Sequence, residues 1–194
     1  MRLIHLAIAS ALSMLLCSLP SCTADTDPAA IESLDPQWFN LNEFVEQQAS
    51  LLAEVDLNKT VVVNGQSETQ RVDTPVWVEE LAPFAQSDID RPALWDSYSV
   101  DTAIISVDRV WQITYSALDS ALFTKRVQVV YFDLSMPLDS AAIVNIDNSF
   151  SSYVADTRQR LRYAPQRYEV TSEQRARLLD PRTLRIVGRW DLPR

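Results

Sequence analysis

Apolar and polar side chains alternate from Ser97 to the end of the chain, and this constrains the fold most. Successive side chains of a β-strand point to opposite faces, so the alternation predicts half-buried strands. We expect strands at 98–100, 111–117, 123–131, 143–147, 153–163, 167–171 and 184–192. Within 123–131, the expected inward face is Phe123, Val127, Val129 and Tyr131. Short turns between the strands predict an antiparallel meander.

A helix is predicted ahead of these strands, from Leu41 to Glu54. Asn40 and Glu43 have the spacing of a capping box, in which the two side chains satisfy free backbone donors at a helix start. The apolar residues at helical spacing, expected on one face, are Leu41, Phe44, Val45, Leu51, Leu52 and Val55.

A hairpin is predicted over 59–72. Val61 to Val63 lead into Asn64-Gly65, and this pair suits a type I′ turn because both central residues need positive φ. We expect the hairpin at a sheet edge.

A second helical region is predicted after Thr74-Pro75, which suits an N-cap followed by proline at the first helical position. Pro83 should kink or end this helix, and 88–95 should form a loop with short turns. Residues 31–194 are thus predicted to be a single α+β domain. Its N-terminal helices would pack on a curled antiparallel meander, with a half-barrel as one form of that sheet.

The N-terminus resembles a bacterial lipoprotein signal. Arg2 and an apolar run precede Leu19-Pro20-Ser21-Cys22, and the run is too short to span a bilayer. We expect residues 1–21 to be removed, Cys22 to carry lipid and residues 22–30 to be a flexible tether. Pro20 is unusual for a lipobox, so a secretory signal cleaved near Ala24 and a retained helix stay as alternatives. Thr23 favours the outer membrane by analogy with enterobacterial lipoproteins.

Removal of this signal would leave a chain poor in catalytic groups. The single histidine is His5 and the second cysteine is Cys17, so residues 23–194 contain neither type. This excludes Ser-His-Asp and Cys-His catalysis and zinc sites made of Cys or His. Gly65 and Gly188 are the two glycines, too few for a P-loop or a dinucleotide fingerprint. We therefore predict no cofactor, no metal and no enzymatic activity.

Acidic residues are the remaining source of chemistry. Asp88 with Asp90, or Asp25 with Asp27, would be near enough in sequence to share a metal, and a carboxylate pair would suit glycoside hydrolysis. Their spacing singles out neither pair, and solvated surface acids are the simpler interpretation.

Charge is distributed unevenly in this chain of net charge −9. Residues 151–194 contain ten arginines and five acids, whereas residues 1–150 hold seven basic and twenty-one acidic side chains. Arg158, Arg160 and Arg162 would lie on one face of a strand. They would bind an anion or an acidic partner, or else pair with acids such as Glu169, Glu173 or Asp133. The export signal and the negative charge argue against nucleic acid.

A second candidate site is apolar. A curled sheet covered by helices would form a concavity for a lipid or another apolar ligand. The residues expected to line it are Trp111, Ile113, Tyr115, Val127, Val129 and Tyr131. The alternative is that they fill an ordinary core.

Three segments, 39–52, 59–69 and 88–98, together resemble a family of uncharacterised lipoproteins common in Bacteroidota. The resemblance implies an envelope lipoprotein and no catalytic residue. We therefore expect a lipid-anchored, non-enzymatic protein of the cell envelope that binds an envelope component or partner protein. A lipid carrier is the alternative, and a carboxylate-based hydrolase is the lesser one.

Overall fold

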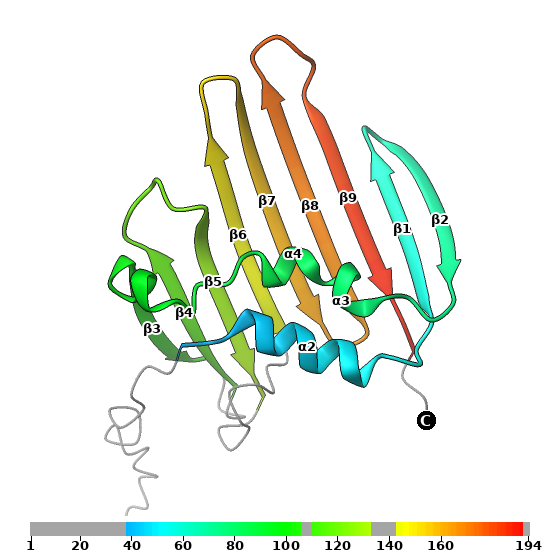
Figure 1. Cartoon of the computed structure of the whole chain (residues 1–194), viewed down its shortest axis with the longest axis horizontal. Coiled ribbons are helices and arrows are strands. Elements are labelled where there is room, and N and C mark those ends of the chain that lie inside the picture. Colours follow the sequence, from blue (N-terminus) through cyan, green and yellow to red (C-terminus); the bar gives the residue numbers. More distant parts are fainter. Residues whose placement is uncertain (1–37, 106–109, 133–142, 192–194) are drawn as a thin grey trace, which may run out of the picture. The chain divides into compact units, whose positions relative to one another are not determined.

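The computed structural model describes residues 38–105, 110–132 and 143–191. They form a nine-stranded antiparallel sheet with short helices on one face (Figure 1). The strands are β1 (Leu57–Val63), β2 (Gln66–Val72), β3 (Tyr98–Ile104), β4 (Trp111–Ala117), β5 (Thr124–Tyr131), β6 (Ile143–Ser151), β7 (Ala155–Ala164), β8 (Arg167–Ala176) and β9 (Arg182–Arg189). The helices are α2 (Leu41–Leu51), α3 (Trp77–Glu80) and α4 (Ala82–Ala85), with a 3₁₀ helix η1 at Pro92–Ser97.

The predicted α+β class and antiparallel meander are confirmed. Strands β3 to β9 are neighbours in chain order, and β1 and β2 continue the sheet beyond β9. The order β2-β1-β9-β8-β7-β6-β5-β4-β3 leaves β2 and β3 at opposite edges, so the sheet is open and not closed into a barrel. Among the described residues, no helix is long and apolar enough to cross a membrane.

The predicted hairpin is confirmed, including its place at an edge. Asn64 and Gly65 have φ of 48° and 87°, which is the positive φ that a type I′ turn requires. β1 pairs with β9, while β2 is the edge strand.

Helix α2 begins where it is predicted and ends earlier. The Asn40 side chain accepts a hydrogen bond from the Glu43 backbone N–H at 2.9 Å. The helix ends at Leu51 instead of Glu54, and Leu51 is 73% exposed. The prediction that Leu51 belongs to the buried face is wrong, because Ala49 lies on that face and Leu51 at its margin.

The predicted helix is interrupted at Leu81, between α3 and α4, and Pro83 lies in the first turn of α4, so the interruption expected from Pro83 is confirmed; Trp77, Leu81 and Phe84 are buried together. The predicted N-cap at Thr74 is wrong. The N-cap residue of α3 is Val76, which makes no side-chain capping bond, and Thr74 has φ of 44° in the turn before it.

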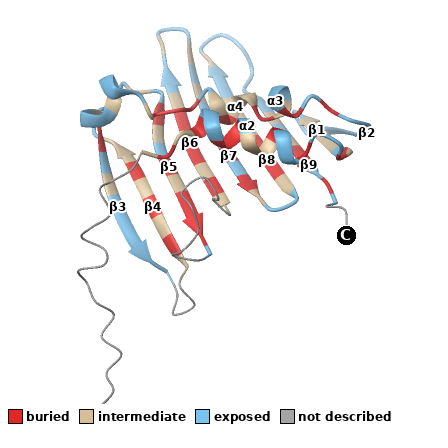
Figure 2. Ribbon diagram, turned by 60° about the horizontal axis from the view of Figure 1, so that its bottom comes forward, coloured by how far each residue is buried: buried red, intermediate tan, exposed pale blue. Residues whose placement is uncertain are grey.

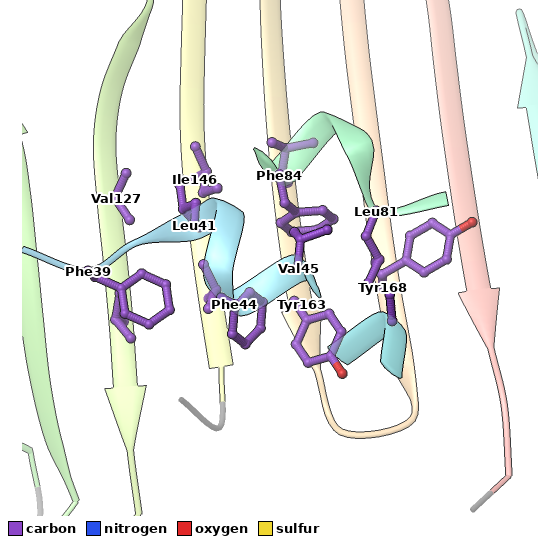
Figure 3. Packing of buried hydrophobic residues seen from close by; sticks show 14 of the residues in the cluster. Phe39, Leu41, Phe44, Val45, Leu81, Phe84, Val127, Ile146, Tyr163 and Tyr168 are labelled. Carbon is purple, nitrogen blue, oxygen red and sulfur yellow. The ribbon is translucent and has the colours of Figure 1, made fainter. Parts of the chain in front are cut away.

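The core lies between the sheet and the helices (Figures 2 and 3). Phe44 of α2 and Phe84 of α4 both meet the ring of Tyr163 on β7 edge to face, with centroids 5.1 and 6.3 Å away. The Tyr163 hydroxyl donates to Gln48 Oε1 at 2.6 Å. Strand β7 is thereby fixed against both helices.

A β-bulge changes the predicted face of β5. Thr124 pairs with Asn148 and Arg126 with Asp147, so Lys125 is an extra residue in the strand. The bulge reverses the alternation ahead of it, so Thr124 is buried and Phe123 is 43% exposed. The prediction that Phe123 shares the inward face is therefore wrong.

Candidate anion-binding face

Arg158, Arg160 and Arg162 lie exposed on the face of β7 that points away from the helices. Leu161 and Tyr163 occupy the opposite face and are buried in the core. The spacing of two thus places the three arginines as the sequence predicts. We call them the arginine row.

The arginine row lies between two strands that carry acids. Arg160 is the register partner of Asp147 on β6, and Arg162 is the partner of Glu169 on β8. Arg158 is opposite Glu173. Opposite charges in such cross-strand positions attract each other, so pairing within the sheet is the arrangement to test first.

Two of these three acids are engaged by other arginines. Asp147 accepts from Arg126 at 2.6 Å, and Glu169 accepts from Arg167 at 2.5 Å and from Arg185 at 2.7 Å. The Arg185 hydrogen bond, reinforced by Arg167, lowers the pKa of Glu169 below its ordinary value.

Within the part of the chain that the structure describes, the arginine row itself forms no ion pair within 4 Å. Its guanidinium groups are therefore available to a ligand. Among the described acids of the sheet, none forms an ion pair with these three arginines, whereas Asp133, the third acid considered as a partner, lies outside the described residues.

An open hollow of about 480 Å³ lies beside Arg160 and Arg162 on the same face. Its lining combines cationic, amide and hydroxyl side chains with two paired acids; the residues are Arg126, Gln128, Asn145, Ile146, Asp147, Arg160, Leu161, Arg162, Glu169 and Thr171. Four adjacent strands contribute to it, since β5, β6, β7 and β8 are neighbours. Planar guanidinium groups beside amide donors suit a carboxylate or a phosphate.

Sequence reasoning missed five polar residues of this hollow: Arg126, Gln128, Asn145, Asp147 and Thr171. They lie on strands for which the sequence prediction named only the inward-facing residues or the bounds. The alternation along residues 126–131 and along β6 was a sufficient signal for Arg126, Gln128, Asn145 and Asp147, because it sends these side chains to the face opposite Val127 and Val144.

The six residues of the predicted apolar site are all buried on the helix-facing side. Trp111 and Tyr131 stack with ring centroids 4.4 Å apart, and Tyr115 stacks on Trp38 at 5.4 Å. The Tyr115 hydroxyl also accepts from the Phe39 backbone N–H at 3.2 Å, while burial raises the pKa of Tyr115 to about 12. These contacts are those of a packed core.

Asp88 and Asp90, which the sequence offered as a pair that could share a metal, instead bind the residues at the start of α2. Asp88 is buried and accepts from the Leu41 backbone N–H at 3.0 Å and from Asn42 Nδ2 at 2.9 Å. Asp90 accepts from Asn40 Nδ2 at 3.1 Å and from Trp95 Nε1 at 3.2 Å. In the described ranges, no group of three or more Asp, Glu, His or Cys side chains is placed to hold a metal ion.

A partly buried charged cluster joins α3 to the sheet. Lys59 Nζ lies 2.7 Å from Glu80 Oε2, and the Tyr168 hydroxyl donates to the same oxygen at 2.6 Å. Sequence reasoning did not find this cluster, since its members come from three distant segments. Each polar group has its partner inside the cluster, so its role is to hold α3 on β1 and β8.

Cys22, Asp25, Asp27, the predicted signal 1–21 and the tether 22–30 lie outside the described residues. No protein-family model, curated protein or solved structure matches the chain. The resemblance to Bacteroidota lipoproteins therefore stays a prediction.

Proposed function

We propose that this chain is a lipid-anchored, non-enzymatic protein of the bacterial cell envelope, attached through Cys22 to the outer membrane. Its arginine row binds an anionic envelope component, by which we mean a partner that presents carboxylate or phosphate groups. The observation that supports this most is the exposed row on β7, which forms no ion pair within the described residues and lies beside Asp147 and Glu169, two acids that other arginines already occupy.

The two acids nearest to Arg160 and Arg162 are already balanced by other arginines. Arg126, Arg167 and Arg185 already hold Asp147 and Glu169. An anion that binds the arginine row therefore does not first have to displace these two carboxylates from it. Each arginine offers a planar fork of donors that matches two oxygens of one carboxylate or phosphate. Two or three such contacts on a rigid strand would be aligned before the partner arrives, which lowers the cost of ordering.

The shape of the site also supports binding over turnover. The hollow is open and bordered by strands, and none of its acids lacks a cationic neighbour: Asp147 and Glu169 are both ion-paired. A general acid or base needs a titrating group within reach of the substrate. Carboxylates that are paired with arginine contribute positioning and charge balance instead.

The lipid-carrier alternative would use the opposite face. It requires the sheet to curl as a half-barrel around an apolar space, with Trp111 and Tyr131 as part of its wall. Those two rings now stack on each other in the core, so a ligand would have to separate them. We therefore favour the arginine row. Native mass spectrometry that finds lipid bound to protein extracted from membranes would reverse this preference.

The test is photo-crosslinking of the full chain in its native envelope. A photoreactive residue replaces Thr171 inside the hollow, and a matched control carries it at Val78, an exposed residue of α3. We expect a defined crosslinked species from position 171, identified by mass spectrometry, and none from position 78. Equal patterns from the two positions would contradict the proposal. A Cys22→Ala chain, compared in parallel, shows whether the anchor brings the partner within reach.

A further inference from the structure

The two hairpin ends at β6–β7 and β8–β9 carry five exposed apolar side chains, which we call the apolar tips: Phe150, Tyr153, Val154, Leu178 and Leu179. Leu178 is 95% exposed and Tyr153 82% exposed. Both hairpin ends project at the top of the sheet in Figure 1, while α2, α3 and α4 cross its lower half. In Figure 2 the same ends are exposed. Exposed apolar groups gathered at one end indicate an interaction site.

The two tips are joined to each other and form one protrusion. The Arg177 backbone N–H donates to the Val154 carbonyl at 3.1 Å, and the Arg177 guanidinium lies 4.4 Å from the centre of the Tyr153 ring. The first turn is closed by Ser152, whose backbone N–H and hydroxyl both donate to the Ala155 carbonyl. Turns that bond internally can enter an apolar medium at low cost, because few backbone groups lose water without replacement.

We infer that the apolar tips insert into the interfacial region of a lipid bilayer. A protrusion of leucine, valine and aromatic side chains needs no shape-complementary partner in lipid, whereas a protein partner would have to provide a cavity. Tyrosine and arginine suit the depth at which an apolar body meets a polar surface, since each has an apolar stem and a polar end. The inference does not rest on the arginine row.

Charge at this end is compatible with an anionic bilayer. Four arginines and three acids lie at or next to the tips: Arg158, Arg175, Arg177, Arg182, Asp156, Glu173 and Asp180. In a chain of net charge −9, this end is cationic by one charge, and it is neutral if Arg158, which belongs to the arginine row, is left out. With so small an excess, burial of the apolar side chains must provide most of the binding, so binding by the tips should depend weakly on salt.

The experiment places an environment-sensitive fluorophore at one position of the full chain. Two single-cysteine chains carry Cys17→Ser and Cys22→Ala together with Leu178→Cys or Leu51→Cys, and each is labelled with the nitrobenzoxadiazole fluorophore. Leu51 is the matched control, an exposed leucine of α2 on the helix side. Protein-free vesicles of phosphatidylethanolamine and phosphatidylglycerol are then added. We expect a blue shift and brighter emission at 178 and no change at 51.

The inference also predicts that the shift at 178 persists at about 0.5 M salt, where charges are screened beyond roughly 4 Å. Leu179→Ser in the labelled chain should weaken vesicle binding about tenfold, because burial of one leucine side chain strengthens binding by about that factor. Bilayer insertion by the apolar tips is contradicted by unchanged emission from the fluorophore at 178 or by an equal shift at 51. A shift that high salt abolishes, or one that requires added envelope protein, would also contradict it. Loss at high salt would point to the arginine row, so the two proposals fail separately.

Discussion

The ring of Tyr168 on β8 lies directly over Gly188, its register partner on β9. A Cβ atom at position 188 would lie 2.1 Å from Tyr168 Cε1, well inside van der Waals contact. One of the two glycines in the chain is thus required by a close approach. Because the Tyr168 hydroxyl bonds Glu80 of α3, this contact also sets where α3 sits on the sheet.

Gly188→Ala should lower the free energy of unfolding by about 1–3 kcal/mol, the range for an overpacked core. The cost should nearly vanish in a Tyr168→Ala background, since the clash is with that ring. Urea denaturation of the four proteins of this double-mutant cycle measures the coupling. Additive effects would show that Gly188 is needed for another reason.

Asp88→Ala should destabilise the protein by about 1–3 kcal/mol. The substitution leaves the Leu41 backbone N–H at the start of α2 without its buried acceptor. Asp88→Asn is the matched control, because its side-chain oxygen can still accept that bond. Equilibrium denaturation distinguishes the two. If alanine and asparagine cost the same, the carboxylate charge and not the cap would be responsible.

Alkaline pH should unfold this protein steeply. Burial raises the pKa of Tyr115 to about 12, and it also raises the pKa of Tyr163 and of Tyr168, where Glu80 adds to the effect. Above about pH 10 the unfolded chain releases these protons while the folded chain keeps them, so stability falls as pH rises. Each tyrosine contributes about 1.4 kcal/mol per pH unit between its unfolded and folded pKa.

The measurement is urea denaturation between pH 8 and about pH 11, with tyrosinate absorbance as the second readout. Tyr115→Phe should flatten the alkaline slope by the share of one tyrosine. A slope equal to that of the original protein would show that Tyr115 ionises in the folded state.

Glu169 should stabilise the fold at neutral pH and cease to do so in acid. Its pKa is lowered by Arg185 and Arg167, so its contribution is present above the ordinary carboxyl pKa and lost as pH falls through the lowered one. Glu169→Gln should flatten the acid side of the stability profile. Glu173→Gln, on the same face and without an ion pair in the described part, is the matched control, and a flattening equal to that of Glu169→Gln would contradict a specific role for the Glu169 ion pairs.

Local chemistry predicted the elements well. Turn, cap and helix-breaking signals each act on a few neighbouring residues, as at Asn64-Gly65, Asn40 and Pro83. A strand with one buried face can be recognised from the alternation of apolar and polar residues. The failures have the same physical origin. Leu51 and Thr74 depend on how α2 and α3 meet the sheet, and Phe123 depends on a bulge at Lys125 that no residue type announces.

The face on which the arginines lie could be predicted from the sequence, but their ion pairing could not. Strand spacing places Arg158, Arg160 and Arg162 on one face without any knowledge of the fold. Which acids they meet depends on strand order and register, and these bring Arg126 to Asp147 and Arg185 to Glu169 instead. Those pairings join consecutive strands, but they depend on the exact register, which the bulge at Lys125 shifts in β5, so the charge left uncompensated could not be counted beforehand.

In our proposal, the arginine row binds an anionic partner. The most direct measurement is the yield of the crosslink from position 171 in the native envelope, in a chain that also carries Arg158→Glu, Arg160→Glu and Arg162→Glu. Arg91→Glu, an exposed site between α4 and η1, is the control for expression and general charge. The reversal of exposed residues should leave the melting temperature within a few degrees. We predict that the triple reversal abolishes the crosslink while Arg91→Glu retains it; a yield unchanged by the triple reversal would contradict the account.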